Sequence, residues 1–297
     1  MPSTYSIAAE PLAKPSRKVS GDRVATLRFW GVRGSTPTVD KTTWRYGGNT
    51  ACVELITPSG SRIILDCGTG LRMLGRHLEA AQEPEKHEPH IFVTHYHWDH
   101  IQGIPFFSPL YNDRESSFVF HSSSRTRGLQ QALEEQMADP YFPVNMSDMA
   151  AHRQFCTIDE GRTQLEGCTV QAMWLNHPQG CLGFRMETQG KVIVYATDNE
   201  PGDPVFDKSV RKLAEGADLL IYDAQYLPEE YAARKQGWGH SHWREAINVV
   251  MESGAKELIL FHHDPDHSDS CIDAVVKQAR EHYPKVRAAS EGMEIVL

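Results

Sequence analysis

The sequence lacks the apolar segments that membrane and exported proteins need. No run approaches the ~18 to 20 apolar residues required to cross a bilayer. The first 25 residues contain proline, serine and lysine, but not the apolar stretch of roughly 7 to 15 residues that a secretory signal requires. We therefore expect no membrane partner and predict a cytoplasmic location.

Basic residues are too few for a protein that binds long nucleic acid. Thirty Lys and Arg oppose thirty-nine Asp and Glu, which gives a formal net charge of −9. Such a balance argues against a phosphate-gripping surface. A small anionic substrate remains compatible with it, because bound cations reverse the local potential.

Paired cysteines are missing as well. No C-x-x-C pair occurs, which excludes zinc ribbons and thioredoxin-like redox sites. In a chain without a signal, scattered cysteines indicate reduced thiols. The six are Cys52, Cys67, Cys156, Cys168, Cys181 and Cys271.

Apolar residues make up 40% of the 297 residues and charged residues 23%, enough for a substantial core. We predict a loose tail over residues 1–25 and one α/β domain over residues 26–297. Apolar runs predict strands at 25–30, 52–57, 62–65, 91–93, 118–121, 191–195, 219–222, 258–261 and 293–297. Helices are predicted at 71–81, 126–137, 243–252 and 271–282.

Several of these strands end in acidic residues or histidines. Asp198 and Asp223 follow two of them, and His262 follows a third. Side chains delivered by several strand ends indicate a shared site at one edge of the fold.

The strongest signal is His95-x-His97-x-Asp99-His100, which directly follows the apolar strand at 91–93. Two histidines at i and i+2 can face one metal, and the Asp and His that follow can reach a second. Imidazole and carboxylate are ligands that Zn²⁺ and similar divalent ions prefer.

With these residues the chain resembles the metallo-β-lactamase superfamily, in particular its phosphodiesterase branch of ribonuclease Z-like and cyclic-phosphate phosphodiesterases. The resemblance runs from about residue 26 to 297. Its motifs occur in the expected order: Asp66 in Leu65-Asp66-Cys67-Gly68, the cluster at 95–100, His177, Asp198 and His262. It implies a single-domain, four-layer αββα sandwich with metals at one edge of the two sheets.

The resemblance also implies two divalent metal ions per chain, Zn²⁺ first, with Mn²⁺ or Fe as alternatives. Asp198 bridges the two metals together with a hydroxide that attacks phosphorus. One ion is expected to be bound by His95, His97 and His177, and the other by Asp99, His100 and His262. His263, next to His262, is interpreted as a supporting or exposed residue.

Further roles follow from the same resemblance. Asp66 is expected to hydrogen-bond the ligand loop without binding metal. His240, in Gly239-His240-Ser241, is the expected general acid, oriented by Asp223, and His242 is its competitor. Asp99 is counted with His240 and Asp223 as catalytic. Stacking on Tyr141 or Phe142 and phosphate pairing by Arg33 or Arg45 are weighed against ordinary structural roles.

The motifs separate the branches. Asp198 stands where β-lactamases commonly have Cys, and Asn176-His177-Pro178 lacks the Gly-His-Thr of thioesterases and lactonases. The interval from His177 to Asp198 is too short for the tRNA-gripping arm of ribonuclease Z.

We therefore predict a phosphodiesterase for a small cyclic nucleotide or phosphoribosyl cyclic phosphate, in a homodimer. The alternatives are a tRNA 3′-end processing endonuclease and a non-hydrolytic metal-bound sensor or binding protein.

Overall fold

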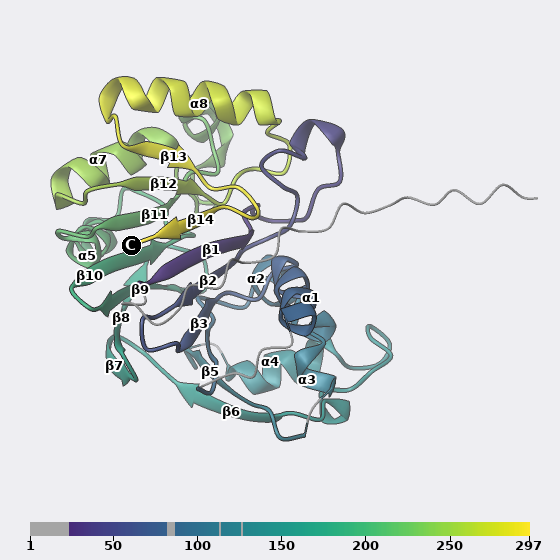
Figure 1. Ribbon diagram of the computed structural model, residues 1–297. Helices are drawn as coiled ribbons and strands as arrows, with labels where there is room; N and C mark the ends of the chain where they lie inside the picture. Colours follow the sequence, from purple (N-terminus) through teal and green to yellow (C-terminus); the bar gives the residue numbers. More distant parts are fainter. Residues whose placement is uncertain (1–23, 82–86, 113, 126) are drawn as a thin grey trace, which may run out of the picture.

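The computed structural model describes residues 24–81, 87–112, 114–125 and 127–297, and these form two seven-stranded β-sheets with helices outside them (Figure 1). The first sheet has the order β14 (Glu294–Val296), β1 (Thr26–Gly31), β2 (Cys52–Ile56), β3 (Arg62–Leu65), β4 (His90–Phe92), β5 (Ser117–Ser122) and β6 (His152–Thr157). The second has the order β13 (Val286–Ala288), β12 (Leu258–Phe261), β11 (Leu219–Asp223), β10 (Lys191–Ala196), β9 (Cys181–Thr188), β8 (Cys168–Leu175) and β7 (Gly161–Leu165).

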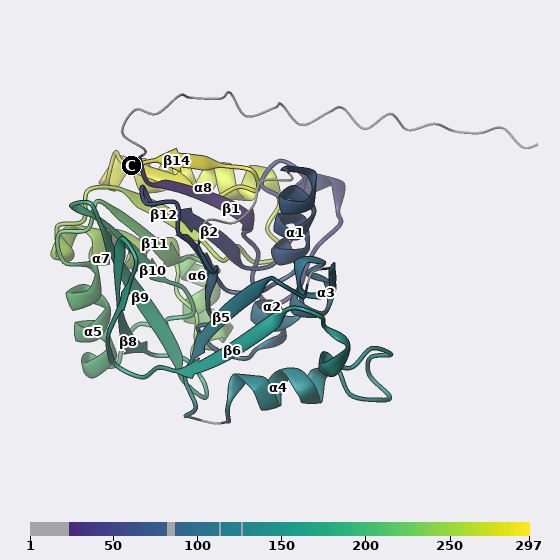
Figure 2. The same cartoon turned by 60° about the horizontal axis from the view of Figure 1, so that its bottom comes forward.

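Helices cover the outer face of each sheet, so the four-layer αββα prediction is confirmed (Figures 1 and 2). Beside the first sheet lie α1 (Gly70–Ala81), α2 (Trp98–Ile101), α3 (Pro109–Asn112) and α4 (Leu129–Gln136). Beside the second lie α5 (Pro204–Ala214), α7 (Trp243–Ser253) and α8 (Asp269–His282). Shorter turns are α6 (Pro228–Glu230), η1 (Lys41–Thr43), η2 (Ile104–Phe106), η3 (Met146–Asp148) and η4 (Tyr231–Lys235).

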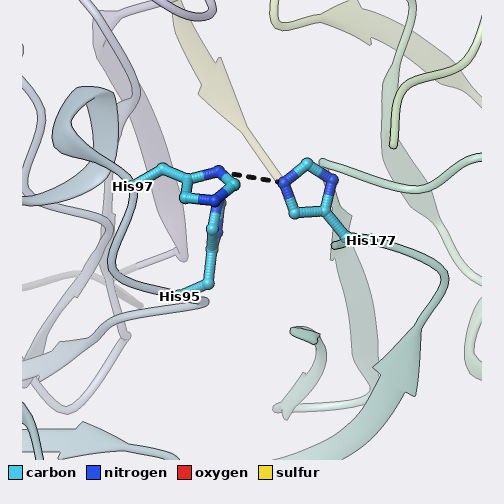
Figure 3. Close-up of side chains that lie close together, drawn as sticks. All are labelled: His95, His97 and His177. Carbon is cyan, nitrogen blue, oxygen red and sulfur yellow. Dashed lines mark hydrogen bonds between the residues drawn. The ribbon is translucent and has the colours of Figure 1, made fainter. Parts of the chain in front are cut away.

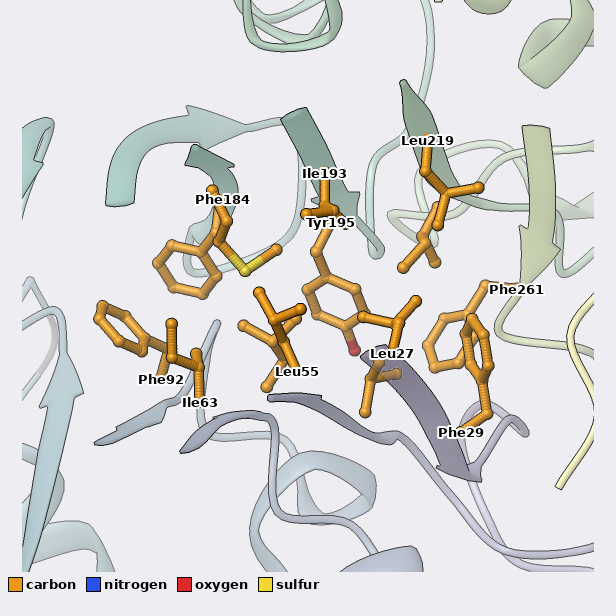
Figure 4. Packing of buried hydrophobic residues seen from close by; sticks show 14 of the residues in the cluster. Leu27, Phe29, Leu55, Ile63, Phe92, Phe184, Ile193, Tyr195, Leu219 and Phe261 are labelled. Atoms are coloured by element: carbon orange, nitrogen blue, oxygen red, sulfur yellow. The ribbon is translucent and has the colours of Figure 1, made fainter. Parts of the chain in front are cut away.

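Three apolar layers hold this sandwich together. The central layer lies between the sheets, where Leu27 and Phe29 of β1 meet Tyr195 and Phe261 of the second sheet (Figure 4). Two further layers pack each sheet against its own helices. Burial of these fully enclosed side chains, at about 25 cal/mol per Å² of apolar area, is the main stabilising contribution to the fold.

The parallel strands share one direction within each sheet. β3, β4, β5 and β6 run parallel, as do β10, β11, β12 and β13. Their carboxyl ends open on one edge of the sandwich, which is where open α/β sheets place their binding sites. The shared edge predicted from the strand-end residues is therefore present.

All nine predicted strands and four predicted helices have counterparts within a few residues. Position 126 of the helix predicted at 126–137, and residues 1–23 of the predicted tail, lie outside the described residues. Five strands, β6 to β9 and β13, occur where the sequence analysis predicts no element, as do helix α5 and the short helices α3 and α6. β6 and β7 are edge strands with mixed burial, which gives them a weak apolar pattern.

Among the described residues, no helix has the length and apolar character to span a membrane.

Candidate metal centre

Every predicted ligand leaves its strand at the carboxyl edge or in the turn that follows. His95, His97, Asp99 and His100 follow β4 and enter α2, His177 follows β8, Asp198 follows β10, and His262 follows β12. Residues far apart in sequence thus meet in one place, and the structure brings all seven together.

The first set is His95, His97 and His177, one ring nitrogen of each lying within 4.8 Å of the others (Figure 3). His97 Nδ1 and His177 Nε2 are 3.1 Å apart, the pair joined by the dashed line in Figure 3. His95 and His177 are buried, whereas His97 is half-buried at the rim. The set therefore opens toward the surface only on the His97 side.

Outer hydrogen bonds fix the protons of this set. His177 Nδ1 donates to the carbonyl oxygen of Gly239 at 2.7 Å, which leaves a lone pair on Nε2. His97 Nε2 donates to Gln179 Oε1 at 3.1 Å, which leaves a lone pair on Nδ1. The two nitrogens that face each other are thus both acceptors, and a cation between them would satisfy both.

The second set is Asp99, His100 and His262. Nε2 of His100 and Nε2 of His262 lie 3.2 Å apart. Each donates its Nδ1 proton outward, His100 to Asp66 Oδ2 at 2.8 Å and His262 to Gln225 Oε1 at 3.0 Å. The Nε2 atoms of both rings therefore face the same space, now beside the carboxylate of Asp99.

Asp198 stands between the two sets, with one oxygen toward each. Oδ1 lies 3.8 Å from His95 Nε2 and 3.7 Å from His177 Nε2. Oδ2 lies 3.3 Å from His100 Nε2 and 3.4 Å from His262 Nε2. Asp198 Oδ1 and His95 Nε2 are buried and have no hydrogen-bond partner in the structure. Orphaned buried polar atoms of ligand type are what a metal site shows when its atoms are described without the ion.

The charges of the group suit divalent cations. Burial lowers the pKa of His95 well below its usual value and that of His177 to about 4. Both imidazoles are therefore neutral and can each offer a nitrogen lone pair to a metal ion. Burial would raise the pKa of Asp198, but His262 and His100 hold it well below its usual value. Burial would lower the pKa of His262, yet Asp198 and Asp99 raise it to about 9, a sign of uncompensated negative charge. The residues present therefore fit two divalent ions.

Three residues of the centre adopt left-handed backbone conformations that non-glycine residues rarely occupy. The φ angles are 60° at Asp66, 57° at Asp198 and 62° at His262. Each costs of order 1–3 kcal/mol and persists only where the surrounding structure enforces it. All three follow directly on, or two residues after, the end of a buried strand, so the strand positions the turn that aims the side chain.

Asp66 joins the ligand loop to both sheets. Its Oδ1 accepts from Thr94 N at 2.8 Å, and its Oδ2 accepts from His100 Nδ1 at 2.8 Å and from the Tyr195 hydroxyl at 2.9 Å. The Thr94 hydroxyl also donates to it. No ring nitrogen of the first set contacts this carboxylate, in line with the supporting role predicted for it.

His240 lies beside the metal-ligand sets and is held by Asp223. His240 Nδ1 donates to Asp223 Oδ2 at 2.9 Å, and Asp223 also accepts from the backbone of Ser241 and Asp198. The ring lines a cleft of about 420 Å³. The other residues of this cleft are Ser35, Tyr96, His97, Trp98, Asp99 and Asp198. Because Asp223 engages Nδ1, Nε2 is the ring nitrogen of His240 that remains available to a substrate.

His242 has a different environment. Its Nδ1 accepts from the backbone N–H of Glu245 at 3.2 Å and caps helix α7. Its ring packs against Tyr231, and it is absent from the residues that line the cleft. The geometry thus favours His240 over its competitor.

Of the two roles weighed for Arg33 and Arg45, the structure supports the structural one. The guanidinium of Arg33 is fully buried and donates to the carbonyl oxygens of Gly47, Asp264 and His267, so it cannot reach a substrate phosphate. Arg45 pairs with Asp273 of α8. Both arginines hold loops in place.

His263 is buried and hydrogen-bonded to the carbonyl oxygen of Ala289, which excludes the exposed interpretation. Sequence reasoning missed the partners that set the imidazole protons, above all Gln225 and the carbonyl of Gly239. Gly239 also leaves room for His177, since a Cβ there would lie 2.3 Å from His177 Nδ1. No local pattern marks either residue, because their role exists only after distant segments meet.

Metal content tests the ligand assignment. Protein purified without chelator should contain about two transition-metal equivalents by elemental analysis. Asp198→Ala should lower that value, since it removes the carboxylate shared by both sets. Asp266→Ala, at an exposed aspartate, is the matched control and should retain the wild-type value. Full content in Asp198→Ala would contradict the bridging role.

The supporting role of Asp66 gives a second test. Asp66→Asn offers one acceptor oxygen and an NH₂ group to four donors, so one donor pair must clash or turn away. Metal affinity should fall by about 10- to 100-fold, measured by competition with a chelator, and the thermal midpoint should fall too. Asp266→Asn serves as the control. Unchanged affinity would refute the proposal that Asp66 orients His100.

Comparisons with known proteins agree with this fold. The family model described as "Beta-lactamase superfamily domain" matches residues 61–263. The ribonuclease Z of Haloarcula marismortui is 26% identical over 90% of this chain and 95% of its own length, and that of Gemmatimonas aurantiaca is 25% identical over 91% and 95%.

Solved structures with the same fold include the metallo-β-lactamase fold protein YhfI from Bacillus subtilis, with a TM-score of 0.69 and 19% identity over 91% of this chain and 98% of that one. A diphosphatase from the PhnP family has a TM-score of 0.67 and 16% identity over 92% and 97%. Human tRNase Z, short form, has a TM-score of 0.63 and 21% identity over 91% and 98%. The matched family model covers more than half of the sequence and includes all seven predicted ligand positions. The chain therefore belongs to the beta-lactamase superfamily.

Proposed function

We propose that this protein hydrolyses a small cyclic phosphodiester, either a cyclic nucleotide or a phosphoribosyl cyclic phosphate, at the centre formed by the two ligand sets. The observation that carries the proposal is Asp198, whose two oxygens each face one set beside an open cleft. Two positive centres a few ångströms apart are the arrangement used to stabilise both oxygens of a phosphoryl displacement.

The reaction class is supported by the family and by relatives named ribonuclease Z that match along nearly the whole chain. On this basis the chain is a metal-dependent phosphodiester hydrolase. The first ion would be held by His95, His97 and His177, and the second by Asp99, His100 and His262. Zn²⁺ is the proposed metal, since imidazole nitrogens dominate the donors.

Bound divalent ions supply Lewis acidity and an activated water in enzymes of this kind. The chain itself orients the reactants. His97, at the rim of the cleft, is fixed by Gln179, and Asp99 is fixed by the backbone N–H of Ser35, which donates to its Oδ2 at 2.7 Å. A phosphodiester in the cleft therefore meets side chains that need no rearrangement.

His240 is proposed as the general acid. Nδ1 is engaged by Asp223, so a proton on Nε2 can pass to the departing alkoxide oxygen. Asp223 keeps the ring in this orientation through the hydrogen bond to Nδ1. A purely metal-binding sensor has no need of such a pair, so the pair favours hydrolysis over the sensor alternative.

The tRNA 3′-end endonuclease remains the second candidate, because the relatives are named ribonuclease Z and human tRNase Z has the same fold. Against it, the interval between His177 and Asp198 is filled by the β9–β10 hairpin, and no separate arm protrudes from these residues. The acidic net charge also disfavours a polyanion. The homodimer and the cytoplasmic location stay predictions.

A substrate panel tests the preference for small substrates. Metal-loaded protein should cleave cyclic mononucleotides with a much higher kcat/KM than precursor tRNA, because the described surface offers no arm for the tRNA body. The panel should include 2′,3′- and 3′,5′-cyclic nucleotides, a phosphoribosyl cyclic phosphate and an aryl phosphodiester. The reverse order would assign the chain to the tRNA-processing group.

The leaving group tests His240. A general acid matters for a ribose alkoxide and little for p-nitrophenolate, which departs without a proton. His240→Ala should keep its metals and most aryl-phosphodiester activity, yet lose roughly 10²- to 10⁴-fold on a cyclic nucleotide. His97→Ala should lose both activities together, and His152→Ala, at an exposed histidine, should lose neither.

Equal damage to both activities in His240→Ala would make His240 a ligand or structural residue. No damage to either would transfer the acid role to His242 or to water.

A further inference from the structure

A larger cavity adjoins the proposed catalytic cleft. Its volume is about 790 Å³, within the range of roughly 300–1,000 Å³ typical of small-molecule sites. The two hollows share Tyr96 and Trp98 as walls, and His95 of the first ligand set also borders the larger one. A substrate whose phosphodiester sits at the metal centre would therefore extend into this cavity.

Aromatic side chains line the cavity in exposed positions. Trp98 is 76% exposed and is the first residue of α2, between the predicted ligands His97 and Asp99. Tyr141, on the same cavity, is 82% exposed. Large exposed rings beside a reaction centre offer flat surfaces on which a base can stack. Trp98 borders both hollows, so a stacked group there would stay close to the phosphodiester.

Besides His95, the cavity wall contains the charged side chains of Arg125, Arg127 and Glu135. Arg127 forms an ion pair with Glu135. Arg125 instead lies over the ring of Trp174, with its guanidinium carbon 4.9 Å from the ring centroid. Among the residues that the structure describes, no carboxylate pairs with Arg125. In a protein with a net charge of −9, an uncompensated arginine in a cavity wall is a candidate anion site.

The loop that carries Gln179 and Gly180 links the arginine to the metal centre. Gln179 accepts the Nε2 proton of His97. A Cβ at the next residue, Gly180, would lie 3.2 Å from Arg125 Nη1, so the guanidinium packs directly on this loop. Arg125 and His97 thus contact neighbouring residues of one short loop. A single ligand can therefore place its phosphodiester at the metal centre and a second anionic group at Arg125.

We propose that this cavity selects nucleotides that carry a second phosphate, with the base stacked on Trp98 and the second phosphate bound by Arg125. This proposal rests on the proposed function and specifies its substrate class: a cyclic nucleotide bearing a further phosphate rather than a plain cyclic nucleotide. Arg125 and Trp98 are then specificity-determining residues.

Binding of products and their analogues tests the subsite without turnover. The probes are adenosine 3′,5′-bisphosphate and adenosine 3′-monophosphate, measured by calorimetry on metal-loaded protein. The wild type should bind the bisphosphate at least about 10-fold more tightly, as expected for charge-assisted hydrogen bonds to one phosphate. Arg125→Gln should abolish this preference without weakening the monophosphate, whereas Arg127→Gln, at the paired arginine, should preserve it within about 2-fold.

The role of Trp98 is tested with the same probes. Trp98→Ala should weaken both nucleotides by roughly 5- to 100-fold, while Trp98→Phe should recover most of the affinity, because a ring is restored. Metal content is measured in each variant, so that loss of the neighbouring ligands is not mistaken for loss of stacking. Equal weakening in the Phe and Ala variants with full metal content would refute stacking.

Turnover separates this proposal from the proposed function. The wild type should cleave 5′-phosphorylated 2′,3′-cyclic AMP with a lower KM than 2′,3′-cyclic AMP, and Arg125→Gln should equalise the two with kcat unchanged. Equal affinity of the wild type for both nucleotide probes would overturn the subsite, even if both cyclic substrates are cleaved. A preserved bisphosphate preference without any phosphodiester cleavage would overturn the proposed function and leave the anion site in place.

Discussion

One buried carboxylate, that of Asp66, connects the two sheets to the residues that would hold the metals. It accepts hydrogen bonds from Thr94 at the end of β4, from His100 in α2 and from Tyr195 in β10 of the opposite sheet. Charge-assisted hydrogen bonds of this kind are strong in a buried setting, and losing one partner leaves the others unsatisfied. The position of the ligand loop therefore depends on the packing of both sheets around a single side chain.

Hydrogen bonds also orient the imidazole rings of the centre. His100, His177 and His262 each give their outer proton to a fixed acceptor, a carboxylate, a backbone carbonyl and an amide oxygen respectively. The inner nitrogen of each ring therefore faces the shared space, so the outer hydrogen bonds orient the rings for metal binding before any ion arrives. Backbone strain at Asp198 and His262 is compatible with this preorganisation, because the rigid strands before them hold the strained turns.

Sequence patterns predicted the buried central strands and the polar residues that follow them better than the edge strands of the sheets. Apolar runs such as 258–261 are continuous because parallel central strands are buried on both faces, and the polar residue after each run marks the functional edge. Edge strands such as β6 carry no comparable pattern, and they were not predicted. At the centre, the seven predicted ligand positions followed from motif order, whereas Gln225 and the carbonyl of Gly239 did not. Those partners are defined by three-dimensional contact alone, as is the burial that rules out Arg33 as a phosphate ligand.

A protein with a negative net charge can bind an anionic substrate if the charge at the binding site itself is positive. The net charge of −9 is spread over the molecule, whereas the carboxylates of the centre are few and face imidazole nitrogens. Two divalent ions would outweigh Asp99 and Asp198 and make that point locally positive, and screening confines the effect to about 10 Å at ordinary salt. A long polyanion would extend beyond this region, where the net charge of the protein is negative, while a small phosphodiester stays inside it. Arg125, which packs on the Gln179–Gly180 loop beside the centre and is unpaired among the described residues, adds a second positive group there, which is the physical reason to expect a compact substrate with two phosphates.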